Sequence, residues 1–200
     1  ENINKMKHLT VKEKEKEGLE KMKEVFHYKN TMATPKMQKV VINVGTGTLV
    51  KKDKNKNDLI SDRLTKITGQ KPALRGAKQS VASFKIRQGD PIGVLVTLRG
   101  KRMYAFLEKL INVALPRTKD FRGINRSGVD NIGNLSIGIK EHTIFPETVD
   151  EDIRDVFGMS ITLVSSAKNK KEGLAFFELL GVPFKKEDVK EAKKKKVEKK

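Results

Sequence analysis

The stretch KPALRGAKQSVASFKIRQGDPIGVLVTLRG, residues 71–100, organises the rest of the chain. Its second half alternates with a period of two, which is typical of a half-buried strand. One face of that strand takes Val94, Val96 and Leu98, and the other takes Leu95, Thr97 and Arg99. The first half is basic and is interspersed with small residues. We therefore predict a long β-hairpin at residues 71–100, with one face packed and the other in contact with a partner.

Basic residues dominate this hairpin and the segments beside it. From Arg63 to Arg126 the chain has 15 Lys or Arg residues against three acids. A solvated surface usually mixes both signs. Backbone next to glycine, alanine or serine can approach a phosphate closely, and cations neutralise it. The pattern favours an RNA-contact surface. The alternative is an exposed hairpin whose charges are merely solvated.

The composition indicates the same class of partner. A chain of 200 residues with 36% hydrophobic residues can form one domain with tails. Its net charge of +18 and its pI near 9.9 are typical of a nucleic-acid binder, with a membrane-surface protein as the competing hypothesis. No apolar run approaches the roughly 20 residues that span a bilayer, and the first residues lack the apolar core of a signal peptide. We expect a cytoplasmic protein with no membrane partner.

Hydrophobic periodicity predicts the remaining elements. Helices are expected at 8–26, 58–68, 101–115 and 170–180, and strands at 37–45, 133–142 and 159–167. In the first helix the predicted apolar stripe is Leu9, Leu19, Met22, Val25 and Phe26. Residues 45–47, Gly-Thr-Gly, follow a strand as a phosphate loop would. The rest of that motif is missing, so a simple turn is the better interpretation.

Two polar residues interrupt the apolar strand at 37–45. Val40, Ile42 and Val44 share one face, whereas Lys39 and Asn43 lie on the other. They are candidate ligands for phosphate and for base or ribose groups. An exposed edge of a sheet would explain the same spacing.

Residues 117–128, RTKDFRGINRSG, form a basic loop punctuated by glycine. Its arginines flank Phe121 and could hold RNA by charge and stacking. Phe121 could equally be a hydrophobic anchor for the loop.

The sequence displays no catalytic or metal-binding pattern. There is no cysteine, and His8, His27 and His142 fall on unrelated predicted elements. The acidic run from Glu147 to Asp155 is expected to be a solvated or protein-facing patch. We expect no enzyme, no metal site and no cofactor.

Several long motifs, in order, resemble one family. They are PKMQKVVINVG (35–45), ITGQKP (67–72), AKQSVASFKIRQGDPIG (77–93), VTLRGKRMYAFLEKLINVALPRTKDFRG (96–123), GNLSIGIKEHTIFPE (133–147) and GMSITLVSSA (158–167). Over residues 5–184 the chain is similar to the 5S-rRNA-binding ribosomal proteins of the large subunit, called L-five in the bacterial naming.

The resemblance implies a fold and a function. The fold would be α+β, an antiparallel β-sheet with helices packed on one face and a long basic hairpin loop at about residues 71–93. The protein would attach 5S rRNA to 23S rRNA in the central protuberance of the large ribosomal subunit, among other proteins of that region. It would also contact P-site tRNA and form an intersubunit bridge to small-subunit protein S-thirteen.

The resemblance also implies site residues. The 5S rRNA contacts would be Lys39, Asn43, Gln70 and Thr97. The tRNA-facing loop would be Arg75, Gly76, Ala77, Lys78, Gln79, Ser80 and Val81, with Ser83 and Lys85. Other rRNA contacts would be Arg87, Arg99, Arg117, Arg122 and Arg126.

The chain departs from the family at two places. Val129 and Ile132 stand where the family usually has an aromatic residue and an arginine. The lysine-rich residues 185–200 follow the single domain predicted for 1–184, and their composition predicts a disordered tail with nonspecific RNA affinity. A free RNA chaperone or translation regulator, or an enzyme acting on RNA, remain competing hypotheses.

Overall fold

One five-stranded antiparallel sheet forms the centre of the molecule. The computed structural model describes residues 9–48, 55–148 and 155–185. The strand order is β2-β3-β1-β5-β4. The bounds are β1 Met37–Gly45, β2 Ala73–Gly76, β3 Pro91–Leu98, β4 Leu135–Ile139 and β5 Met159–Ser165. The predicted α+β class is confirmed, and the strand predicted at 37–45 matches β1 residue for residue.

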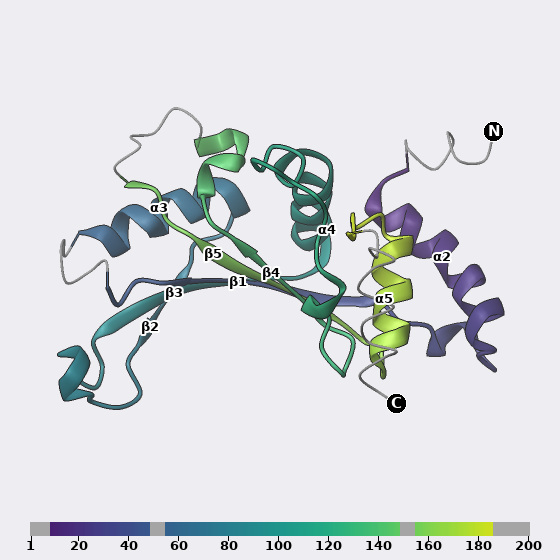
Figure 1. The fold of residues 1–200 in the computed structure, drawn as a ribbon, viewed down its shortest axis with the longest axis horizontal. Helices are drawn as coiled ribbons and strands as arrows, with labels where there is room; N and C mark the ends of the chain where they lie inside the picture. Colours follow the sequence, from purple (N-terminus) through teal and green to yellow (C-terminus); the bar gives the residue numbers. More distant parts are fainter. Residues whose placement is uncertain (1–8, 49–54, 149–154, 186–200) are drawn as a thin grey trace, which may run out of the picture.

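Four α-helices accompany the sheet in the described residues. They are α2 Val11–Phe26, α3 Lys56–Thr68, α4 Gly100–Lys109 and α5 Lys170–Leu179. A five-residue π-helical segment, Leu110–Ala114, extends α4, so the helix predicted at 101–115 has two geometries. Figure 1 shows α3 and α4 on one side of the sheet, while α2 and α5 lie next to each other at one end of it.

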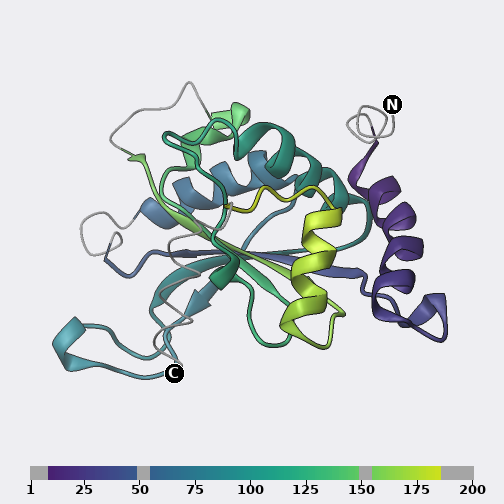
Figure 2. The same cartoon turned by 45° about the vertical axis from the view of Figure 1, so that its right-hand side comes forward.

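The core lies between the sheet and α3 and α4. Val40, Ile42 and Val44 of β1 are fully buried and stand opposite Leu98, Val96 and Val94 of β3. The stripe predicted on the helix at 101–115 is buried as well, from Met103 to Ala114. Figure 2 shows the same arrangement after a turn of the molecule, with α3 and α4 still on one side of the strands. The predicted packed faces of β1, β3 and the helix at 101–115 are therefore confirmed.

The first helix differs from its prediction. It begins at Val11, because Thr10 and Glu13 form a capping box whose side chains bond each other's backbone N–H groups. Its buried positions are Val11, Glu15, Gly18 and Met22, whereas Val25 of the predicted stripe is 67% exposed. Hydrophobic periodicity does not identify Glu15 and Gly18 as buried, because one is an acid and the other is a glycine that faces Leu179 of α5.

Strands β2 and β3 pair antiparallel and are joined by residues 77–90. The paired arms are short, since β2 has only four residues and its register shifts between Arg75 and Gly76. Most of the basic stretch thus lies in the connection, which we call the tip loop (residues 77–90), and which extends away from the helices in Figure 1. At the start of β3, Ile92 accepts a backbone hydrogen bond from Thr46 at 2.8 Å. The turn predicted at residues 45–47 lies at residues 47–48, because Gly45 is still the last residue of β1.

Two segments of interest are only partly covered by the structure. Asp150, Glu151 and Asp152 of the acidic run, and residues 186–200 of the predicted tail, lie outside the described residues. None of the helices in the described ranges combines the length and the apolar character that crossing a bilayer requires.

Candidate nucleic-acid interface

The sheet has an open face, which consists of the side chains that alternate with the core. On β1 and β3 these are Lys39, Val41, Asn43, Leu95 and Thr97. Asn43 is exposed, and Lys39 and Thr97 are half-buried. Because β1 pairs with β3 on one side and β5 on the other, it is the middle strand, and the alternative of a sheet edge is wrong. The structure therefore brings Lys39, Asn43 and Thr97 onto one surface.

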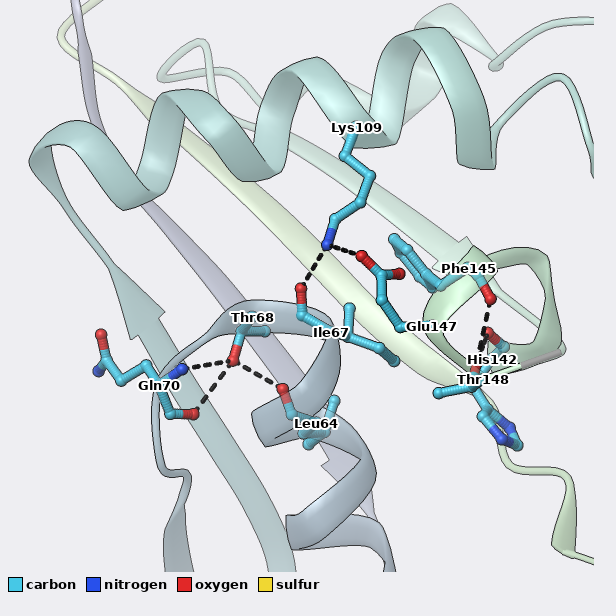
Figure 3. Close-up of polar contacts among 9 residues, drawn as sticks. All are labelled: Leu64, Ile67, Thr68, Gln70, Lys109, His142, Phe145, Glu147 and Thr148. Atoms are coloured by element: carbon cyan, nitrogen blue, oxygen red, sulfur yellow. Dashed lines mark hydrogen bonds and ion pairs between the residues drawn. The ribbon is translucent and has the colours of Figure 1, made fainter. Parts of the chain in front are cut away.

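Gln70 lies beyond the end of α3, next to β3. Gly69 follows the last residue of the helix in the left-handed conformation, with a φ of 67°, which glycine adopts readily. The hydroxyl of Thr68 lies 2.7 Å from the carbonyl oxygen of Leu64 and 3.1 Å from that of Gln70 (Figure 3). Gln70 Nε2 donates to the carbonyl oxygen of Thr97 at 3.2 Å. The Gln70 amide is thus held against β3.

The open face continues over β5 and β4 with small polar residues. Val41 is opposite Thr162, which is opposite Ser136, and Asn43 is opposite Ser160, which is opposite Gly138. The hydroxyl oxygens of Ser136 and Thr162 are 3.3 Å apart. Ser136 and Gly138 alternate with the buried residues of β4 and are exposed. Only the strand order shows that Ser136 lies in line with Val41, and Gly138 with Asn43.

The tip loop is internally hydrogen-bonded. Ala77 N–H donates to Asp90 O at 2.8 Å, and Gly89 N–H donates to Ala77 O at 3.0 Å. Further along, Val81 and Ile86 pair as an isolated bridge, and Gln88 N–H donates to Ser80 Oγ at 2.9 Å. The loop therefore presents its cations from a defined backbone rather than from a loose coil.

Most residues of the predicted tRNA-facing loop are exposed. The exception is Ala77, which is 6% exposed and whose backbone is bonded across the loop. The single acid of the hairpin, Asp90, accepts a hydrogen bond from Arg87 N–H at 2.7 Å, so it shapes the loop. Phe84, which is not among the predicted contacts, lies in the short helix at the tip and is 62% exposed.

The other predicted rRNA contacts divide into two groups. Arg87, Arg99, Arg117 and Arg122 are exposed. Arg126 forms an ion pair with Glu178 of α5 at 2.8 Å, and its side chain is 41% exposed. Phe121 packs against the hydrophobic core, as the anchor hypothesis predicts. In the loop at 117–128, Arg126 thus attaches the loop to α5, and Arg117 and Arg122 are exposed on its surface.

The described acids of the run that begins at Glu147 face the protein. Glu147 pairs with Lys109, whose ammonium also donates to Ile67 O at 2.7 Å (Figure 3). Asp155 pairs with Lys56 and lies 3.6 Å from Arg63. The hydrogen bond from Lys56, with the charges of Lys56 and Arg63, lowers the pKa of Asp155. These pairs join α3 and α4 to the chain between β4 and β5.

The side chain of His142 is part of the packed interior. It is fully buried, its ring stacks on Phe157 with centroids 4.2 Å apart, and its Nδ1 accepts from Phe157 N–H at 3.3 Å. Within the described ranges, no three His, Cys, Asp or Glu residues are grouped so that they could hold a metal ion.

Comparisons with known proteins cover most of the chain. A family model described as ribosomal protein L5 matches residues 30–87, and a second model, which describes the C-terminus of the same ribosomal family, matches residues 91–184. The large ribosomal subunit protein uL5 of Halothermothrix orenii is 49% identical over 164 residues, 82% of this chain and 91% of that protein. The protein of the same name from Mycoplasma mycoides is 48% identical over 178 residues, 89% of this chain and 98% of that one.

Proposed function

Because the chain belongs to the ribosomal protein L5 family, we propose that its open face binds 5S rRNA and helps to attach it to 23S rRNA. The family is structural, so the chain is a structural constituent of the large ribosomal subunit and not an enzyme. The proposal concerns which RNA the chain holds and through which residues.

The observation that supports it is the grouping of Lys39, Asn43 and Thr97 on the open face, opposite the buried core. Lys39 supplies a positive charge for a phosphate, and Asn43 and Thr97 supply hydrogen bonds to ribose or base. Phosphate contacts supply most of the affinity, and the hydrogen bonds fix the position of the RNA and respond to its shape. The paired strands β1 and β3 hold these groups in place.

Gln70 takes a positioning role in this proposal. Its Nε2 donates to Thr97 O, so the side chain fixes the turn after α3 next to β3. The remaining amide hydrogen and Oε1 can still contact RNA, since one amide offers several bonding positions.

The tip loop, with Arg75 and Gly76 of β2, is proposed to contact P-site tRNA. Lys78 and Lys85 are exposed there, and the hydrogen-bonded backbone holds the loop away from the sheet. Because the tip loop and the open face are formed by different residues, one molecule can hold 5S rRNA and tRNA at separate sites. Arg87, Arg99, Arg117 and Arg122 would add phosphate contacts.

The family resemblance alone supports the protein partners. They are small-subunit protein S-thirteen, across an intersubunit bridge, and other proteins of the central protuberance. A single RNA-binding domain at 1–184 and a lysine-rich tail at 185–200 complete the proposed organisation.

Selective RNA binding tests the proposal. The full chain should bind a 5S rRNA transcript more tightly than a scrambled RNA of equal length, at several salt concentrations, since nonspecific binding weakens steeply with salt. It should also remain with large subunits during sedimentation in high salt, whereas a free chaperone would wash off. Equal affinity for both RNAs would refute the proposed 5S function.

A further inference from the structure

A second concave site lies at the edge of the sheet, beside the open face. It is a pocket of about 850 Å³ between the loop that follows α4 and strand β4. Ser136 and Gly138 line it and also belong to the open face, so the two surfaces are continuous. Its walls combine apolar side chains such as Ile124, Ile137 and Phe121 with polar ones such as Thr118 and Asn125.

The edge of β4 supplies backbone hydrogen-bonding groups to this pocket. β4 is the last strand of the sheet, and the loop pairs with it only near Leu135, where Asp130 N–H donates to Asn134 O at 2.9 Å. The N–H and C=O of alternate residues in an antiparallel strand point to the same side. The groups of Gly138 therefore point outward like those of Asn134, at a position that lines the pocket. The N–H of Gly138 is thus a donor, and its C=O an acceptor, on the side of the strand that faces the pocket.

Cations border the same pocket. Arg117, Lys119 and Lys140 line it and are exposed, against the carboxylates of Asp120 and Glu141. Apolar walls, a paired donor and acceptor, and cations at the rim match the three parts of a nucleotide: a flat base, its hydrogen-bonding edge and a phosphate. An extended peptide pairing with β4 would use the backbone groups but would not require cations at the rim.

We propose that this pocket takes one unstacked nucleotide of the RNA that crosses the open face. The base enters between Phe121 and β4 and bonds the backbone of Gly138, and Arg117 or Lys119 neutralises its phosphate. The source of the nucleotide, 5S rRNA, rests on the proposed function above, whereas the pocket's affinity for a nucleotide does not.

Two variants close the pocket. Ser127→Trp places an indole in the pocket from an exposed position of the loop, and Thr143→Trp does so from a half-buried position after β4. Ala105→Trp, on the exposed side of α4, is the matched control because Ala105 does not line the pocket. Thermal unfolding of all three variants shows which of them retain the fold, and only those are compared.

The first experiment titrates the isotope-labelled full chain with AMP, GMP, CMP and UMP through the millimolar range. At least one should shift the amide resonances of Gly138 and Asn125 saturably, and Ser127→Trp should weaken that binding at least about fivefold, the lower end of what one stacked base contributes. Ala105→Trp should bind as the wild type does. If no nucleotide moves these resonances, the pocket is not a nucleotide site, and an extended peptide becomes the better candidate.

The second experiment cross-links the chain to 5S rRNA substituted with 4-thiouridine. Cross-links to peptides containing residues 117–128 or 136–143 should appear in the wild type and in Ala105→Trp and disappear in Ser127→Trp, while cross-links near Asn43 persist. Cross-links near Asn43 alone in the wild type would overturn the pocket proposal and leave the 5S function intact. Failure of all 5S binding, with nucleotide shifts at Gly138, would instead remove the 5S function and leave the pocket.

Discussion

The side chain of Gln70 donates a hydrogen bond to the backbone carbonyl oxygen of Thr97, with 3.2 Å between Nε2 and the oxygen. Gln70→Glu places an anionic oxygen against that carbonyl, so we expect a loss of about 1 kcal/mol in the free energy of unfolding and weaker 5S rRNA binding. Urea denaturation and filter binding measure the two effects. Gln88→Glu, an equal charge change on the exposed tip loop, is the control. Identical behaviour of the two variants would contradict the role of Gln70.

Variants of the neutral and of the charged residues on the open face should differ in how their 5S rRNA affinity depends on salt. Asn43→Ala and Thr97→Ala each remove a neutral hydrogen-bonding group, so 5S affinity should fall about fivefold, or ~1 kcal/mol, with an unchanged slope of log K against log salt. Lys39→Ala should lower that slope by up to about one unit, since it removes one phosphate contact. Filter binding at several potassium chloride concentrations measures this, and a changed slope in Asn43→Ala would count against the assignment.

A substitution on the tip loop should affect the proposed tRNA contact without affecting 5S rRNA binding by the open face. Lys78→Glu reverses a charge on the loop, so it should weaken the contact with P-site tRNA and leave 5S affinity nearly unchanged. Ribosomes reconstituted with this variant should show faster loss of P-site tRNA than ribosomes with Lys12→Glu, which reverses an exposed charge on α2. A loss of 5S binding in Lys78→Glu would show that the loop is wrongly assigned.

The sequence predicts the strands better than their arrangement. The alternation of Val40, Ile42 and Val44 identifies a buried face because a strand turns every second side chain to the same side. The same pattern cannot distinguish a central strand from an edge strand. The line from Thr97 through Val41 and Thr162 to Ser136 therefore depends on the strand order, which joins segments far apart in the chain.

Charge patterns identify a basic surface but not which cations are available. Arg122 and Arg126 look equivalent in the sequence, yet Arg122 is exposed and Arg126 pairs with Glu178. The pocket beside β4 was equally inaccessible to sequence reasoning, because its walls are a loop and a strand edge that meet only in the fold. The sequence predicted only the basic loop at 117–128, which forms one wall of this pocket.

Two glycines should differ in how much stability they lose on the same substitution. A Cβ on Gly173 would lie 2.6 Å from Gly133 Cα, where α5 meets the turn before β4, whereas a Cβ on Gly138 would have no atom within 4 Å. Gly173→Ala should therefore lower the free energy of unfolding by about 1–3 kcal/mol, and Gly138→Ala should change it by less than about 0.5 kcal/mol. Urea denaturation of both variants decides, and equal stability would show that α5 can shift without cost.

The ion pair between Asp155 and Lys56 should make stability depend on pH. The hydrogen bond from Lys56 is the largest cause of the lowered pKa of Asp155 in the folded chain. A carboxyl with a lowered folded pKa stabilises the protein above its unfolded pKa of about 3.9, and this stabilisation is lost as the pH falls through the folded value. Asp155→Asn should thus destabilise the protein at about pH 7, and its deficit relative to the wild type should shrink below about pH 4.

Asp62→Asn is the control for this pH dependence, because Asp62 pairs with Lys66 at the surface with its side chain 69% exposed. Surface pairs of this kind contribute little to stability, so this variant should follow the wild type at every pH. Urea midpoints measured between about pH 7 and pH 3 test both variants. A deficit in Asp155→Asn that stays constant over this range would mean that the charge of Asp155 is not what stabilises the junction between α3 and β5.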